Sequence, residues 1–270
     1  MPDGFSSALA AVVQALFLLA SIYIYLALVR QIGARETVVG EETERPFGLP
    51  EIFLALVFAT LFGLNAFASS THAEKMVIGS RELIANGLIS AAVFLFIAAF
   101  LKFRGFNVST LAGFTRLGFW RTLITGVVLL FAAYPLIIIA DALTRRFLGG
   151  ESSTQGIVEM FNESASMEQR VVIIILAVAI APLVEEFVFR FFLYGVMKQY
   201  VGRFAGLLAN SVLFAAVHGH APSAAPLFVL GACFTLAYEW SGSILVAMTM
   251  HALFNSLTLT ALAFPELVGQ

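Results

Sequence analysis

Six polar or ionisable side chains interrupt strongly apolar sequence in the C-terminal half of the chain: Glu185, Glu186, Arg190, His218, His251 and Asn255. The stretches that contain them are VEEFVFRFF, FAAVHGH and MHALFNS. Moving a charge to the middle of a bilayer costs about 2.5 to 3.5 kcal/mol even on a lenient insertion scale, so such residues are usually paired and functional. We therefore expect these three segments to build a polar functional site.

Helical geometry separates the two adjacent glutamates. Residues four apart lie on one face of a helix, whereas neighbouring residues diverge by about 100°. Glu186 and Arg190 are therefore expected to pair, and a structural salt bridge explains them as well as a catalytic role does. Glu185 has no local cation, so we expect it to contact a group from another helix or to line a wet cavity.

The two other motifs repeat the four-residue spacing. His251 and Asn255 share a face, like two donors directed at one acceptor, which suits an oxyanion. The ring of Phe214 is expected to pack beneath the imidazole of His218. Taken singly, an intramembrane His or Asn is as often an interhelical hydrogen-bonding residue as a catalytic one. Convergence of three helices on acid-base and oxyanion groups favours a catalytic site.

The composition places the chain in a bilayer. Hydrophobic residues make up 60% of the 270 residues and charged residues only 12%, and the mean hydropathy is +0.94, well above that of soluble domains. The net charge of -2 shows no basic excess, which excludes a nucleic-acid partner. Because Cys233 is the single cysteine, neither a disulfide framework nor a pair of zinc-binding thiolates is available.

We predict an all-α fold, a polytopic transmembrane helical bundle with seven or eight spans, multi-pass in the cell (inner) membrane. The apolar windows are 8–29, 50–68, 83–101, 122–143, 171–189, 204–219, 224–240 and 243–264. The region 170–200, interrupted by Pro182, is either one long kinked helix or two helices. We expect a single membrane domain over residues 1–270, in which 1–169 supply scaffold spans and 170–264 the motif-bearing helices.

The three motifs, in chain order, are Glu185-Glu186-x-x-x-Arg190, Phe214-x-x-x-His218 and His251-x-x-x-Asn255. This ordered set resembles the CPBP intramembrane proteases, a family that includes type II CAAX prenyl endopeptidases and bacteriocin-processing or immunity proteins. The resemblance covers roughly Val171 to Thr260. The preceding 170 residues match the family only as generic membrane spans.

The resemblance implies a role for each motif residue. Glu185 would be the general base that activates a water together with His218, while His251 and Asn255 would stabilise the oxyanion. The supporting residues would be Glu186, Arg190 and Phe214. A desolvated glutamate suits proton abstraction near neutral pH. The implied activity is an endopeptidase acting on a peptide bond near the membrane, with prenylated CAAX-type proteins among its substrate classes.

The involvement of a metal is open at this stage. Glu185, His218 and His251 could supply a zinc triad, yet the His-Glu-x-x-His motif of zincins is absent. We expect a metal-independent glutamate mechanism that requires no cofactor, with zinc as the alternative. His220 could assist either version, although its place in the loop from Gly219 to Pro222 fits a structural role better.

Two other classes of protein are consistent with the same residues. A proton-coupled transporter also uses intramembrane Glu, His and Arg, but the charges cluster in one block here instead of recurring in two related halves. A catalytically silent scaffold or immunity protein would keep the motifs without using them. For the peptidase, the expected partners are a peptide or lipidated-protein substrate and membrane lipid. The oligomeric state is not indicated by the sequence.

Overall fold

The computed structural model describes residues 2–38, 46–71, 80–148, 161 and 166–264. All secondary structure in these ranges is helical, which confirms the all-α prediction. The elements are α1 (Pro2–Val38), α2 (Leu49–Thr71), α3 (Ser80–Phe103), α4 (Val108–Leu111), α5 (Phe119–Leu148), α7 (Met167–Ile175), η1 (Leu176–Ile180), α8 (Ala181–Glu186), η2 (Phe187–Leu193), α9 (Tyr194–Val201), α10 (Arg203–Val217), η3 (Ala221–Ser223), α11 (Ala224–Ser241) and α12 (Ile244–Ala263). Elements η1 and η2 are π-helical, and η3 is a 3-10 turn.

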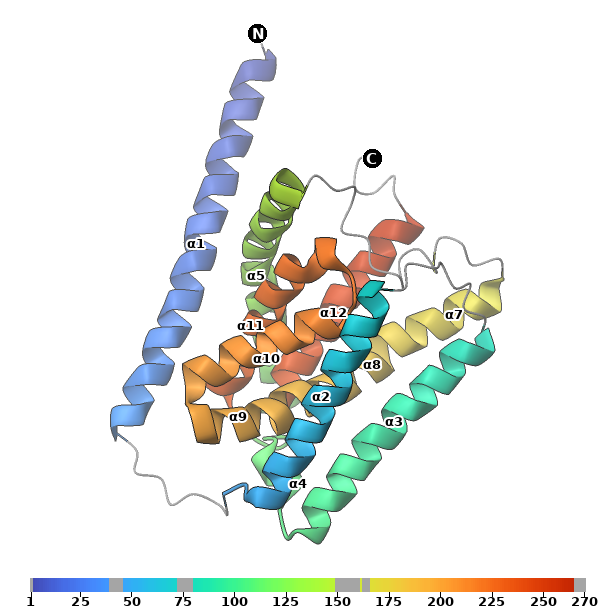
Figure 1. Cartoon of the computed structure of the whole chain (residues 1–270). Coiled ribbons are helices and arrows are strands. Elements are labelled where there is room, and N and C mark those ends of the chain that lie inside the picture. Colours follow the sequence, from blue (N-terminus) through green and yellow to red (C-terminus); the bar gives the residue numbers. More distant parts are fainter. Residues whose placement is uncertain (1, 39–45, 72–79, 149–160, 162–165, 265–270) are drawn as a thin grey trace.

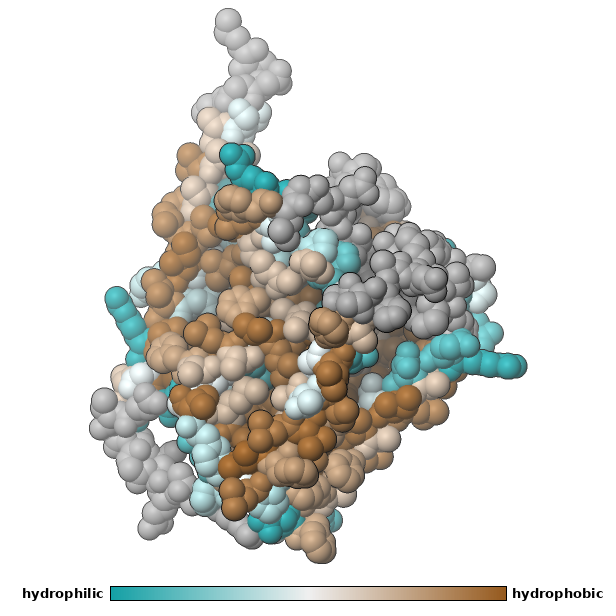
Figure 2. Space-filling model, viewed as in Figure 1, coloured by the Kyte–Doolittle hydropathy of each residue, from teal (hydrophilic) through white to brown (hydrophobic). Residues whose placement is uncertain are grey.

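Seven helices within the described ranges are long and apolar enough to cross a membrane, as expected for a multi-pass membrane protein. They fall on seven of the eight predicted apolar windows. The remaining window, 204–219, forms α10, which has only 15 residues. A helix of that length extends about 22 Å, less than the roughly 30 Å of a hydrocarbon core. Figure 2 shows mostly hydrophobic side chains across the middle of the visible face, with hydrophilic ones toward its margins.

Residues 167–201 form one uninterrupted helical run, so the alternative of two separate spans in this region is wrong. The run alternates between α- and π-helical stretches, from α7 through η1, α8 and η2 to α9. Pro182 lies in the first turn of α8. Because Pro182 lies inside this continuous run, it lacks an N–H at a position where the helix would otherwise form a backbone hydrogen bond.

The helices that carry the three motifs pack together. Figure 1 shows α1 and α3 at opposite sides of the bundle, with α5 and the C-terminal helices between them. Helix α12 contacts α5, α8 and α11, while α10 contacts α9, α11 and η2. Helix α11 therefore lies between the helices that carry the two histidine motifs, although it carries none of the predicted site residues.

A cluster of charged and polar side chains joins α9, α10 and α11 near their ends. Glu239 of α11 accepts hydrogen bonds from Lys198 Nζ of α9 at 2.7 and 3.0 Å and from the hydroxyl of Tyr194 at 3.2 Å. Arg203 Nε, at the start of α10, lies 3.0 Å from the same carboxylate. This cluster fixes the ends of α9, α10 and α11 relative to one another.

A close backbone contact sets the start of α12, the helix that carries His251. The N–H of Ile244 donates to the carbonyl of Ala112 at 3.0 Å. Gly113 and Gly242 both have left-handed backbone conformations, with φ of +68° and +64°. A Cβ atom added to Gly113 would lie 1.9 Å from the carbonyl oxygen of Gly242. Only glycine allows the two backbones to approach this closely.

Substitution Gly113→Ala is therefore expected to destabilise the protein by roughly 2 to 5 kcal/mol, from the left-handed backbone and the steric clash combined. Thermal unfolding in detergent measures the effect. The matched control is Gly118→Ala in the same connection, where an added Cβ atom would meet no atom within 4 Å. Equal stability of the two variants would show that the contact between Gly113 and Gly242 does not hold the start of α12.

Candidate active site

The second glutamate, Glu186, lies at the centre of the site and has no solvent exposure. Its Oε2 lies 3.1 Å from Nε of the equally buried Arg190, which confirms the predicted pair. Its Oε1 lies 2.8 Å from Nδ1 of His251 on α12. Glu186 is therefore not neutralised within its own helix alone, because it also holds the histidine of the third motif.

The first glutamate, Glu185, lies on the other side of the same imidazole. Its Oε2 is 3.9 Å from His251 Nε2, and 30% of its side chain is exposed. The Oε2 atom is buried and makes no hydrogen bond among the described residues. The expectation that Glu185 meets a group from another helix is therefore confirmed, and that group is His251. The carboxylate is therefore partly exposed as a whole, while its Oε2 has an unused acceptor capacity inside the protein.

His218 is the C-cap residue of α10, and a hydrogen bond defines the orientation of its ring. Its Nδ1 lies 2.7 Å from the carbonyl oxygen of Phe214. A carbonyl only accepts hydrogen bonds, so Nδ1 carries the proton, and Nε2 of the neutral ring is left as an acceptor. The Phe214 ring meets the imidazole edge to face, with centroids 4.9 Å apart. The predicted packing of these two side chains is confirmed.

Aromatic rings enclose the cationic side of the site. The guanidinium of Arg190 lies 4.0 Å from the ring centroid of Phe214 and 5.2 Å from that of Phe234. Such contacts stabilise a cation that has left water. Phe234 also stacks on the His251 imidazole, with centroids 5.1 Å apart and ring planes inclined by 29°. Phe214 and Phe234 thus fix the orientation of both the arginine and the histidine.

The described hydrogen bonds of His251 and Asn255 go to two different acceptors. His251 Nδ1 is bonded to Glu186, whereas Asn255 Nδ2 donates to the backbone carbonyl of Ala177 in η1 at 2.7 Å. The two residues share one face of α12, as predicted. The Asn255 amide has one further N–H beyond the hydrogen bond to Ala177.

A comparison with known protein families finds a match in this part of the chain. Residues 167–257 match a family model described as "Type II CAAX prenyl endopeptidase Rce1-like". Residues 167–257 form an Rce1-like domain. The matched segment contains all three motifs, and it confirms the resemblance stated from the sequence. No curated protein and no solved structure matches the chain.

The Rce1-like domain also contains a site residue that the sequence analysis missed. Phe234 is fully buried and contacts both His251 and Arg190. A phenylalanine in an apolar span carries no signal of its own in a single sequence. Only the packing of α11 against α10 and α12 reveals the contact. His220, in contrast, lies in the predicted loop, where its Nδ1 is 3.0 Å from the hydroxyl of Ser223.

Whether a metal ion fits the Rce1-like domain depends on how its donor side chains are arranged. Within the described part of the chain, no group of three His, Cys, Asp or Glu side chains is arranged so that it could hold a metal ion. Glu185, His218 and His251 are therefore not gathered into a metal-binding set in this arrangement.

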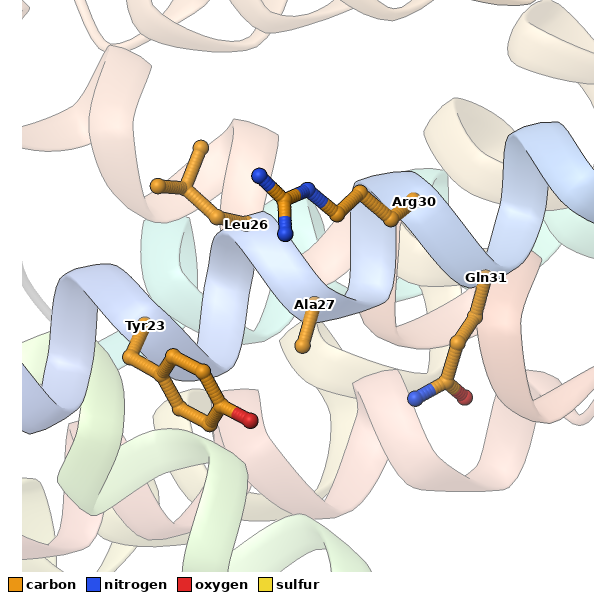
Figure 3. Close-up of a pocket in the computed structure, with 5 residues that line it drawn as sticks. All are labelled: Tyr23, Leu26, Ala27, Arg30 and Gln31. Atoms are coloured by element: carbon orange, nitrogen blue, oxygen red, sulfur yellow. The ribbon is translucent and has the colours of Figure 1, made fainter.

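A surface groove elsewhere in the protein does not belong to this site. It has a volume of about 310 Å³ and is lined by α1 alone, by Tyr23, Leu26, Ala27, Arg30 and Gln31 (Figure 3). All five residues lie outside the Rce1-like domain. The groove therefore adds no residue to the candidate active site.

Proposed function

We propose that the Rce1-like domain is an intramembrane endopeptidase that hydrolyses a peptide bond with a water activated by Glu185. The observation that supports this most strongly is the position of the His251 ring between two carboxylates, 2.8 Å from Glu186 and 3.9 Å from Glu185. One carboxylate is buried and fixed by Arg190. The other is partly exposed, and its Oε2 makes no hydrogen bond among the described residues, so the carboxylate is not committed to a structural partner and suits the role of a general base.

In the proposed reaction, Glu185 removes a proton from water while His218 Nε2 accepts the second hydrogen bond of that water. The resulting hydroxide attacks the carbonyl carbon of the substrate and forms a tetrahedral oxyanion. The oxyanion collapses, the C–N bond breaks, and the protonated Glu185 gives its proton to the leaving amine. The new carboxylic acid passes its remaining proton to the amine, so the products are a carboxylate and an ammonium group, and Glu185 returns to its ionised form.

His251 is proposed to stabilise the oxyanion, which requires a donor at Nε2. Because its Nδ1 donates to Glu186, a second donor at Nε2 means that the ring is protonated on both nitrogens. A protonated His251 and Arg190 would together balance the negative charges of Glu185 and Glu186. Such a neutral four-group cluster avoids leaving a net charge inside the membrane, which would be costly.

The proposed substrates are peptides with an apolar or lipidated segment near the scissile bond. The site lies among apolar spans, so an apolar segment of the substrate would remain in hydrocarbon while the peptide bond enters the polar cluster. The description of the matched family supports prenylated C-terminal peptides as the first class to test. The cell membrane remains the proposed location.

The test uses the full chain reconstituted in lipid nanodiscs. Farnesylated and geranylgeranylated CAAX peptides, their unprenylated counterparts and a library of membrane-proximal peptides are incubated with it, and products are identified by mass spectrometry. Cleavage at one defined bond is expected. A transporter would instead accumulate a solute in liposomes under a proton gradient without any peptide product, and that result would contradict the peptidase proposal.

A further inference from the structure

The helical run that carries the two glutamates has a gap in its hydrogen-bond ladder. In η1 the bonds follow the π-helical register, and the N–H of Ala181 donates to the carbonyl of Leu176, five residues earlier. The next donor in this register would belong to residue 182, which is a proline without an N–H. The carbonyl of the buried Ala177 is thereby left without a donor from its own helix.

Asn255 fills this gap from another helix. Its Nδ2 donates to the Ala177 carbonyl at 2.7 Å. An unpaired backbone carbonyl is costly in a membrane, and proline is tolerated in such helices where a neighbouring side chain satisfies the freed group. Pro182 precedes Glu185 by three residues, and Asn255 follows His251 by one helical turn. The hydrogen bond thus joins the two helices close to the groups that are proposed to react.

We propose that Asn255 acts chiefly as a positioning residue, which fixes the Pro182 segment to α12 and so sets the separation between Glu185 and His251. This inference rests on the proposed function. A misplacement of about 1 Å can lower a reaction rate by roughly 10²-fold, and the 3.9 Å between Glu185 and His251 depends on how these two helices are held. A role in oxyanion binding would use the other N–H of the same amide.

Restoring the missing backbone donor separates the two roles of Asn255. Pro182→Ala gives residue 182 an N–H that can pair within the helix. Asn255→Ala alone is expected to lower kcat/KM about 10²-fold and the apparent Tm by roughly 2 to 8 °C. In the double variant, kcat/KM should recover by at least about tenfold and most of the Tm loss should disappear, because the helix supplies its own donor. Asn255→Leu, whose side chain has a similar shape but no donor, should behave like Asn255→Ala.

The matched control is Pro135→Ala, which removes a proline inside α5, away from the Ala177 carbonyl. It should not rescue Asn255→Ala. A double variant of Pro182 and Asn255 that is as inactive as Asn255→Ala would overturn the positioning role, and recovery of Tm without recovery of kcat/KM would reduce the bond to a purely structural one. If the wild-type protein cleaves no peptide, the proposed function fails, whereas the Tm coupling between positions 182 and 255 still decides whether the tether exists.

Discussion

Replacement of Glu185 by glutamine is expected to abolish peptide hydrolysis, with a loss of about 10²- to 10⁴-fold in kcat. Glutamine has nearly the same shape but cannot take a proton from water. The fold should survive, because Glu185 is partly exposed and its nearest described ionic contact, to His251, is as long as 3.9 Å. The measurement is turnover of the cleaved peptide in nanodiscs, alongside thermal unfolding of the same preparation.

The control for this variant is Glu168→Gln. Glu168 is an exposed carboxylate at the start of the same helical run, in the first turn of α7, and lies outside the site. Its replacement should leave both turnover and stability unchanged. If Glu185→Gln retained wild-type turnover while the protein cleaved peptide, the assignment of Glu185 as the base would be wrong.

Replacement of Glu186 by glutamine is expected to destabilise the fold itself. Arg190 has no solvent exposure, and its ionic partner at 3.1 Å is Glu186. Removing one member of a buried ion pair typically costs about 3 to 5 kcal/mol, because the other charge remains buried without compensation. His251 would also lose its fixed orientation, so activity should fall together with stability. Unfolding by heat or denaturing detergent measures the first effect and peptide turnover the second.

A double variant tests whether the buried charge causes this loss. Combining Glu186→Gln with Arg190→Met removes both charges, and it should be more stable than Glu186→Gln alone while remaining inactive. The comparison pair is Asp141 and Arg145, also four residues apart in a helix, with the arginine more than half exposed. Asp141→Asn should cost less than about 1 kcal/mol. Equal losses in Glu186→Gln and Asp141→Asn would contradict a special cost of burial.

The sequence alone was sufficient to predict those features that depend on the geometry of a single helix. Hydropathy identifies a span without knowledge of its neighbours, because the bilayer sets its length. The pairing of Glu186 with Arg190 and the contact of Phe214 with His218 follow from a four-residue spacing, which is local geometry. For the same reason, the placement of His251 and Asn255 on one face of α12 was predictable.

The tertiary structure decided which helices contact each other and which atoms they present. The bond from His251 to Glu186 joins residues 65 apart, and the bond from Asn255 to Ala177 joins residues 78 apart. Both depend on the rotation and depth of α8 and α12, which a pattern of apolar residues does not fix. Whether Pro182 ends a helix was likewise undecidable locally, because it depends on a donor from another helix. The six polar residues were therefore visible in the sequence, but the contacts of His251 with the two glutamates come from helix packing.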